Sequence, residues 1–318
     1  MIGFLILFSP FFIIGRSSWI LIWIIIELRS ISFIILINIT ENNKESLLKY
    51  FLIQATASCF ILINFMKISI EESTQINRIS INFYIIIITA IAIKIAIPPL
   101  HWWIIKITKN ITWSNLLILL SWQKLIPIFI LLNNSLWKII FFISILTILW
   151  GTLSQINISY IKIILTFSSI RHIGWIIITN KRNFIIPILY LLIYIFIFVI
   201  ILTELKKNNL NLLWKIKSKF KKLLIRVLII SIAGIPPLLG FLPKWITLMF
   251  LINTNQRIIF ISIIIVMATI NFYIYRRLMT PLFIITNKKY LFNFKEKLIN
   301  SKIYFNILLP ILPLVFKK

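Results

Sequence analysis

The sequence predicts an all-α fold, a polytopic membrane helical bundle that forms a single transmembrane domain over residues 1–318. Hydrophobic residues make up 60% of the 318 residues, which leaves too little polar surface for a soluble globule. Apolar runs of the roughly 20 residues needed to cross a bilayer follow one another almost from end to end. A chain of this kind belongs in lipid.

The apolar runs predict about 11 transmembrane helices joined by short polar connections. The expected helices cover residues 2–15, 18–38, 46–66, 80–105, 113–132, 136–155, 158–179, 184–205, 223–252, 257–275 and 301–316. Two longer connections should lie at the membrane face. Residues 206–222 mix Lys with Leu and Trp, as an amphipathic surface helix does. Residues 276–318 contain a polar connection and the C-terminal helix.

A short motif recurs in two of the expected helices. The residues Ile97-Pro98-Pro99-Leu100 are repeated as Ile235-Pro236-Pro237-Leu238. Transporters commonly contain inverted repeats with a broken helix at the corresponding place in each half. The motif therefore predicts two inverted repeats. The expected cores are 18–132, with a discontinuous helix broken near 94–99, and 136–275, with one broken near 233–244.

Three lysines inside apolar helices, Lys94, Lys124 and Lys244, each lie within four residues of a proline. A charge inside the bilayer costs at least about 2.5 kcal/mol and seldom occurs without a function. An interior proline leaves one helical carbonyl without its hydrogen bond, and lipid tolerates such a group only beside protein or water. We therefore expect hydrated cavities beside these lysines. The helix breaks are expected at Pro98, Pro99, Pro127, Pro236, Pro237 and Pro243.

Glu27 is the one acidic residue well inside the first eight apolar runs. Burial favours the neutral form of a lysine and a nearby carboxylate favours its charged form, so a change in that attraction can release a proton. Glu27 is the expected partner, and Lys94 is its mate if their helices touch. The sequence leaves two interpretations open. The lysines form a proton relay with Glu27, or they extend from helix ends toward the interface.

The other buried ionisable residues leave similar alternatives. His172 lies one turn after Ser168 and Ser169, and either belongs to the relay or makes a polar contact between helices. For His101, directly after the double proline, a structural role is favoured. Arg29 and Arg171 either serve as counter-charges or lie near helix ends.

The composition excludes several classes of function. The lone Cys59 supports neither a disulfide framework nor an iron–sulfur cluster with four protein ligands. The six glycines lack the spacing of a nucleotide-binding loop. The net charge of +27 does not indicate nucleic acid binding, because the basic residues lie mainly at helix ends and in connections. We expect no cofactor and no metal in this chain.

The distribution of Lys and Arg predicts the orientation in the membrane. In the eleven-helix arrangement, the connections on the N-terminal side carry about twice as many basic residues as those on the other side. The N-terminus and the connection 206–222 should therefore face the inner side. Residues 1–15 lack the charged start and cleavage site of a signal peptide, and we expect them to be a retained short helix.

Six blocks of the sequence carry a family resemblance. They are WIIIELRSISF at 23–33, KIAIPPLHWW at 94–103, SWQKLIP at 121–127, WGTLSQI at 150–156, TFSSIRHIGW at 166–175 and AGIPPLLGFLPKW at 233–245. In order and spacing they resemble subunit 2 of mitochondrial NADH dehydrogenase, an antiporter-like subunit in the membrane arm of respiratory complex I. The abundance of Ile, Asn, Lys and Phe is typical of an insect-like, AT-rich mitochondrial genome.

The resemblance implies a role for each expected site residue. Glu27 and Lys94 match the ion pair of the family, Lys124 matches its central lysine, Lys244 the lysine of the second broken helix, and His172 a histidine of the polar axis.

Four residues depart from the family pattern. Ala96 stands where glycine is usual, Leu100 where phenylalanine is usual, Arg29 where asparagine is usual and Arg171 where a small or neutral residue is common. Arg29, two residues after Glu27, is expected to compete with Lys94 for the charge of that glutamate.

The resemblance also implies the function. We expect a core membrane subunit of NADH:ubiquinone oxidoreductase that translocates protons through the Glu/Lys relay, driven by electron transfer in other subunits. NADH, FMN, iron–sulfur clusters and ubiquinone would belong to the parent complex. The expected partners are the other membrane-arm subunits and the lipid bilayer, with cardiolipin among its lipids.

The chain is expected in the mitochondrial inner membrane, with its N-terminus in the matrix and its C-terminus in the intermembrane space. Two alternative functions stay open: a structural membrane scaffold and a stand-alone cation/proton antiporter.

Overall fold

The computed structural model describes residues 19–41, 44–73, 81–133, 136–179, 184–207, 219–236, 238–254 and 258–284, with a few isolated positions before residue 19. These ranges are helical and contain no strand, which confirms the all-α class for the part of the chain described. The chain divides into two compact units, Met1–Phe142 and Ile143–Lys318.

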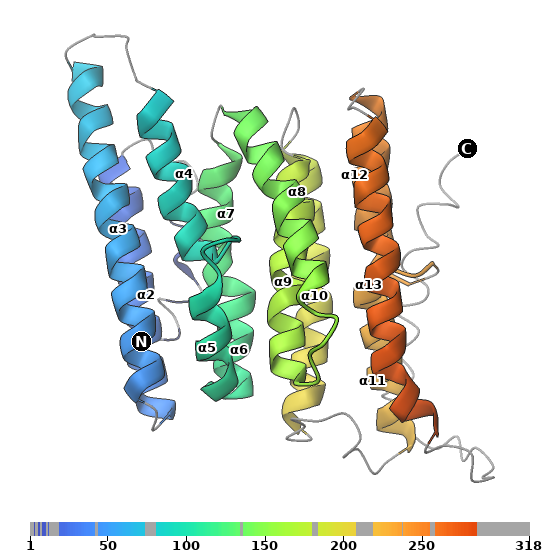
Figure 1. Cartoon of the computed structure of the whole chain (residues 1–318). Helices are drawn as coiled ribbons and strands as arrows, with labels where there is room; N and C mark the ends of the chain where they lie inside the picture. The colour runs from blue at the N-terminus through green and yellow to red at the C-terminus, as the bar shows by residue number, and fades with distance from the viewer. Residues whose placement is uncertain are drawn as a thin grey trace. The chain divides into compact units, whose positions relative to one another are not determined.

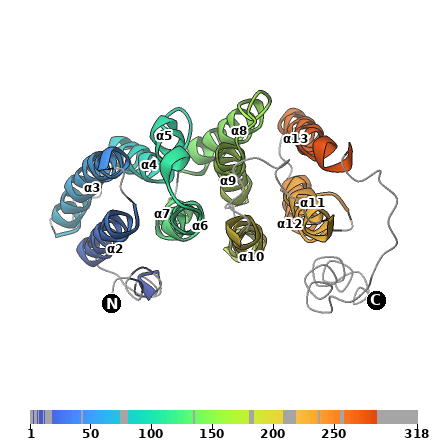
Figure 2. The same ribbon diagram turned by 90° about the horizontal axis from the view of Figure 1, so that it is seen from below.

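The first unit is built around helix α3. It contains α2 (Trp19–Thr40), α3 (Lys44–Ser73), α4 (Ile81–Ile95), α5 (Trp102–Asn110), α6 (Trp113–Leu120), the short 3₁₀ helix η2 (Trp122–Lys124) and α7 (Leu125–Leu132). Helix α3 packs against α2, α4 and α5, and α4 packs against α7. The helices of this unit run nearly parallel or antiparallel to one another (Figures 1 and 2).

The second unit surrounds a nearly fully buried helix, α9 (Ile161–Ile178). Helix α8 (Trp137–Leu153) starts in the first unit and continues into the second. The remaining helices of the unit are α10 (Ile185–Lys207), α11 (Lys219–Ala233), α12 (Phe241–Asn253) and α13 (Ile258–Ile284). Helix α10 packs against α9, α11 and α12, and α11 packs against α13.

The break between α4 and α5 has a local cause. Ala96 has a φ of 66°, a left-handed conformation that cannot extend the right-handed helix. Pro98 has no N–H group to bond the carbonyl of Lys94. The helix therefore ends at Ile95 and resumes at Trp102, and the two halves lie one above the other in Figure 1.

The break between α11 and α12 follows the same plan. Gly234 has a φ of 80°, a conformation that glycine adopts at little cost, and Pro236 follows it. At the start of α12, a methyl group on Gly240 would collide with the carbonyl oxygen of Ser231, so this glycine permits a close approach of the two halves. Pro237 lies outside the described residues.

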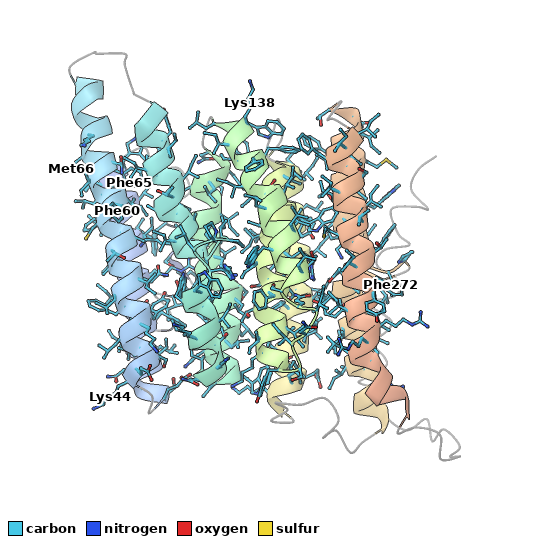
Figure 3. The ribbon with its side chains drawn as sticks, in the orientation of Figure 1. Lys44, Phe60, Phe65, Met66, Lys138 and Phe272 are labelled. Atoms are coloured by element: carbon cyan, nitrogen blue, oxygen red, sulfur yellow. The ribbon has the colours of Figure 1, made fainter. Side chains whose placement is uncertain are left out.

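Six segments of the described part are long and apolar enough to cross a membrane. They are Trp19–Thr40, Lys44–Lys67, Trp113–Leu132, Ile161–Ile178, Ile185–Lys206 and Ile258–Met279. The apolar side chains of Phe60, Met66 and Phe272 are exposed and point away from the helices (Figure 3), as expected of a surface that faces lipid.

The observed helices follow the predicted ones closely. The nine helices expected between residues 18 and 275 each match one observed helix or a pair of half-helices. The ranges 80–105 and 223–252 are interrupted at the predicted breaks, and η2 adds an interruption beside Lys124. The expected helix 301–316 and most of 2–15, 206–222 and 276–318 lie outside the described residues.

Candidate functional site

Lys94 lies in the last turn of α4, directly before the first break. Its side chain is only 7% exposed, and its Nζ atom has no hydrogen-bond partner. Across the break, Trp103 Nε1 donates to the carbonyl oxygen of Ile93 at 3.1 Å. The indole thereby bonds one of the last carbonyls of α4 and ties α5 to the end of that helix.

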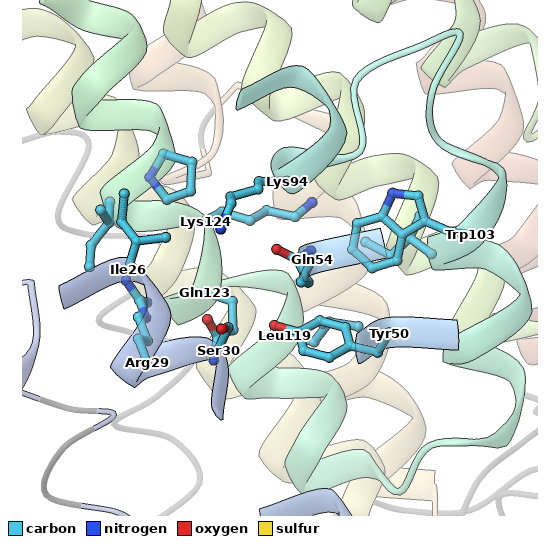
Figure 4. A pocket seen from close by; sticks show the side chains of 13 residues that line it. Ile26, Arg29, Ser30, Tyr50, Gln54, Lys94, Trp103, Leu119, Gln123 and Lys124 are labelled. Carbon is cyan, nitrogen blue, oxygen red and sulfur yellow. The ribbon is translucent and has the colours of Figure 1, made fainter. Parts of the chain in front are cut away.

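A single cavity of the first unit brings Lys94 and Lys124 together (Figure 4). Lys124 ends η2 and is 4% exposed. The cavity has a volume of about 20 Å³, which is enough for at least one water molecule. Its other polar lining residues are Arg29, Ser30, Tyr50, Gln54 and Gln123. Pro127 also lines it, so the cavity lies at the interrupted helix, where the sequence predicts one.

Glu27 takes a position beside this cavity without lining it. The hydroxyl of Ser30 donates to Glu27 Oε2 at 3.1 Å. Glu27 acts electrostatically on Lys94, but among the described residues no carboxylate lies within ion-pair distance of the Lys94 ammonium. Helix α3 packs against both α2 and α4, the helices that carry the two side chains. The structure therefore brings the two groups near each other without a direct ion pair.

Arg29 lies on the opposite side of α2 from the exposed face and lines the cavity with Lys94 and Lys124. Its side chain is 2% exposed, and none of its three guanidinium nitrogens has a hydrogen-bond partner. It makes no ion pair with Glu27, which sits two residues earlier on the same helix.

In the second unit, Lys244 is hydrogen-bonded across the second break. It lies in the first turn of α12, is 6% exposed, and donates to the carbonyl oxygens of Ala233 at 2.6 Å and Ile232 at 3.2 Å. These carbonyls end α11 and have no further helical N–H to bond. The lysine thus caps the C-terminus of one half-helix from the other. It also lines a largely apolar cavity of about 320 Å³ with Gly234 and Trp175.

His172 faces a separate small cavity of the second unit. Its Nδ1 atom lies 2.9 Å from the Tyr190 hydroxyl, and its ring packs on Tyr194. Its Nε2 atom is buried without a hydrogen-bond partner. The cavity, about 10 Å³ in volume, is also lined by Ile232 and Pro243. The carbonyl oxygen of Ile232 accepts a hydrogen bond from Lys244, and Pro243 directly precedes Lys244 in the sequence. The structure therefore places His172 and Lys244 at the same helix break.

Arg171 forms a bridge between helices beside His172. Its Nη1 atom donates to Gln155 Oε1 at 2.9 Å, and its Nη2 atom donates to the Tyr275 hydroxyl at 3.1 Å. The side chain is 1% exposed. Both partners are neutral, so Arg171 contributes a fixed positive charge to the interior of the second unit.

No metal-binding cluster is found in the described ranges, since no three His, Cys, Asp or Glu side chains converge there. The cavities around the lysines lack acidic residues, and the largest is mainly apolar. The arrangement places buried amines beside hydrogen-bonding carbonyls or beside a cavity large enough for water.

The structure places residues around the lysines that the sequence does not predict as part of the site. Arg29 was not assigned to the site, and Tyr50, Gln54 and Gln123 were not singled out, although all four line the first cavity. Their polarity within apolar segments was the signal available. Tyr190, the partner of His172, carries no such signal, because tyrosine is common in membrane helices.

The chain matches the family described as NADH:quinone oxidoreductase/Mrp antiporter, TM, over residues 17–271. It is 30% identical over 316 residues to NADH-ubiquinone oxidoreductase chain 2 of Anopheles gambiae, covering 96% of this chain and 92% of that one. It is 34% identical over 307 residues to NADH-ubiquinone oxidoreductase chain 2 of Rhipicephalus sanguineus, covering 94% of each.

A solved structure shares the fold. It is the structure of respiratory complex I from Thermus thermophilus with bound aureothin. This chain superposes on one chain of that structure with a TM-score of 0.79 at 18% identity, and the match covers 96% of this chain and 76% of that chain. Because the sequence matches extend over nearly the whole length of the relatives from Anopheles gambiae and Rhipicephalus sanguineus, the chain belongs to the NADH-ubiquinone oxidoreductase chain 2 family.

Proposed function

We propose that this chain is the proton-translocating chain 2 subunit in the membrane arm of mitochondrial NADH:ubiquinone oxidoreductase. Lys94, Lys124 and Lys244 carry the protons, with Glu27 and His172 as supporting groups. The observation that carries this proposal is that each lysine is buried at an interrupted helix and lines a cavity. Buried ionisable groups at such places mark ion pathways in membrane proteins.

In the first unit, the proton passes between Lys94 and Lys124 through their shared cavity. The cavity has room for a water molecule and is lined by hydroxyl and amide groups that can orient it. Glu27 lies near enough to influence the charge on Lys94, yet is held by Ser30. A shift of the Glu27 carboxylate toward or away from Lys94 would change the affinity of that lysine for its proton.

In the second unit, Lys244 holds its proton against backbone carbonyls. The C-terminal carbonyls of a helix carry partial negative charge, which favours the ammonium form. Arg171 adds a fixed positive charge that opposes it. His172, at the same break, provides a neighbouring acceptor.

We also propose that the two units are inverted repeats, corresponding to the cores 18–132 and 136–275. The residue before each Ile-Pro-Pro-Leu motif, Ala96 or Gly234, has a left-handed conformation, which supports an equivalent construction of the two breaks. The N-terminus is assigned to the matrix and the C-terminus to the intermembrane space, on the distribution of Lys and Arg.

The proposed partners are the other membrane-arm subunits and lipid, including cardiolipin. NADH, FMN, the iron–sulfur clusters and ubiquinone are assigned to the other subunits of the complex. The chain itself supplies proton-carrying side chains and no redox group.

The experiment that tests the assignment compares the chain in its native membranes with the isolated chain. On a blue-native gel probed for this chain, the proposal expects migration with a large complex that oxidises NADH. Migration at the size of the single chain, with cation-driven proton exchange by the isolated chain in liposomes, would instead support a stand-alone antiporter.

A structural scaffold is the second candidate, and the Arg171 bridge favours it. A charge that only joins helices, as Arg171 does through Gln155 and Tyr275, needs no proton movement. The scaffold account expects substitution of any buried lysine to prevent assembly. The relay account expects the Lys94→Met variant to assemble and to lose proton pumping.

A further inference from the structure

The cavity of the first unit is surrounded by hydrogen-bond donors that have no acceptor. All three guanidinium nitrogens of Arg29, the ammonium of Lys94 and the side-chain amide nitrogen of Gln123 are buried without a hydrogen-bond partner, and all three residues line this cavity. Buried donors are almost always satisfied in folded proteins. So many unsatisfied donors around one small space indicate that an acceptor belongs there.

The described residues that line the cavity include neutral oxygens, from Ser30, Tyr50, Gln54 and Gln123, but no negatively charged acceptor. The whole sequence has seven acidic residues, all of them glutamates, against 34 basic ones. None of the seven glutamates lines the cavity. In the first unit, Glu27 accepts from Ser30, Glu41 accepts from Thr112 and Asn115, and Glu45 pairs with Lys49 on the outer surface.

Arg29 gives the cavity a permanent positive charge that no neighbouring negative charge among the described residues balances. A buried lysine can lose its proton and become neutral, but an arginine stays charged under all physiological conditions. A buried charge without a partner is strongly unfavourable, and the cost is met by a counter-ion or a hydrogen-bonded opposite charge. Since Arg29 is 2% exposed, bulk water does not solvate its charge.

The size of the cavity limits what the acceptor can be. Its volume of about 20 Å³ is close to that of a single water site. A phosphate or a carboxylate-bearing side chain needs more room than this. A water molecule would accept hydrogen bonds but would not neutralise the guanidinium. A monatomic anion meets both requirements.

We propose that the cavity between Arg29, Lys94 and Gln123 is a binding site for a small inorganic anion, chloride in the cell. The anion accepts from the guanidinium of Arg29, the ammonium of Lys94 and the amide of Gln123, and it faces Lys124 across the same cavity (Figure 4). Its negative charge beside both lysines favours their protonated forms, and the anion alternates in this cavity with the water that carries the proton between them. That consequence rests on the proposed relay, whereas the binding site itself does not.

The test measures halide binding to the full-length chain in detergent micelles, without NADH. Chloride-35 NMR line broadening is followed as chloride is added, and bromide is used as the competitor. Saturable broadening that bromide reverses is expected for the unmodified chain. In Arg29→Gln, halide affinity should fall by about tenfold or more, because the permanent charge is lost. Arg277→Gln removes an exposed arginine of α13 and should leave halide affinity unchanged.

Two further variants guard against a folding defect. Gln123→Leu removes one neutral donor and should weaken halide binding less than Arg29→Gln does. Arg29→Lys keeps the charge and should retain part of the affinity. Absence of saturable broadening in the unmodified chain, or equal affinity in Arg29→Gln and Arg277→Gln, would overturn the proposal. Because the assay involves no electron transfer, its failure would leave the proton-relay function untouched.

Discussion

The ammonium of Lys244 donates to the carbonyl oxygen of Ala233 at 2.6 Å, across the break between α11 and α12. The lysine of one half-helix therefore bonds the end of the other. Lys94, at the end of α4 in the first unit, has no such acceptor and faces a cavity instead. The two lysines thus hold their protons in different surroundings, one against backbone and the other against a polar cavity.

The first prediction concerns the glycine beside Lys244. A methyl group on Gly234 would lie 2.6 Å from Lys244 Nζ and 2.8 Å from its Cδ, and the residue has a φ of 80°. We expect Gly234→Ala to cost about 1–2 kcal/mol in backbone strain and to displace the lysine from Ala233. Thermal unfolding of the assembled complex should start at a lower temperature, and proton pumping per NADH should fall. Unchanged pumping would mean that the position of Lys244 does not matter for transport.

At the first break, between α4 and α5, we expect a substitution to raise the stability of the chain instead of lowering it. Ala96 has a φ of 66° and bears a Cβ atom, so it carries strain that glycine would relieve. Ala96→Gly should raise the free energy of unfolding by about 1 kcal/mol and leave proton pumping unchanged. The measurement compares the thermal stability of Ala96→Gly in detergent with that of the unmodified chain. A loss of stability in Ala96→Gly would contradict the strain assigned to this residue.

The hydrogen bond between His172 and Tyr190 gives a third prediction. Tyr190→Phe removes the hydroxyl that lies 2.9 Å from His172 Nδ1, and a buried bond of this kind contributes about 1 kcal/mol. If His172 accepts protons in the relay, the loss of its positioning should slow NADH-driven pumping more than it slows assembly. Tyr273→Phe, at an exposed position of α13, is the matched control and should behave as the unmodified chain does. Equal pumping in both variants would assign His172 a structural role.

The fourth prediction concerns the Arg171 bridge. Tyr275→Phe removes one of the two hydrogen-bond partners of a buried arginine. A buried charge that loses a partner destabilises a protein by about 1–3 kcal/mol. We expect less assembled complex on a blue-native gel, with normal pumping by the complex that does form. A selective loss of pumping at normal assembly would instead place Arg171 in the relay.

The helices and their breaks could be predicted from the sequence because lipid imposes a simple rule. Each membrane-crossing helix must be a long apolar run, and prolines mark the places where backbone bonds are lost. The breaks predicted near 94–99 and 233–244 lie where α4 and α11 end. Lys94, Lys124 and Lys244 could be selected for the same reason, since a charge in such a run is costly.

The surroundings of these lysines could not be predicted, because they depend on contacts between distant segments. Lys244 donates to carbonyl oxygens eleven and twelve residues earlier, across a break whose geometry cannot be predicted from the sequence. Ser30 holds the carboxylate of Glu27, and Arg29 takes a place in the cavity. Because the Ile-rich helix α2 is apolar on all its faces, the sequence does not predict the direction in which the side chain of Arg29 points.

The most direct test of the central claim is the number of protons translocated per electron in sealed vesicles that contain the assembled complex. Lys124→Met removes a buried amine that is 4% exposed, and Lys138→Met removes an exposed one at the start of α8 (Figure 3). A proton relay predicts a clearly lower proton-to-electron ratio for Lys124→Met and an unchanged ratio for Lys138→Met, with both complexes assembled. An unchanged ratio in Lys124→Met would contradict the relay.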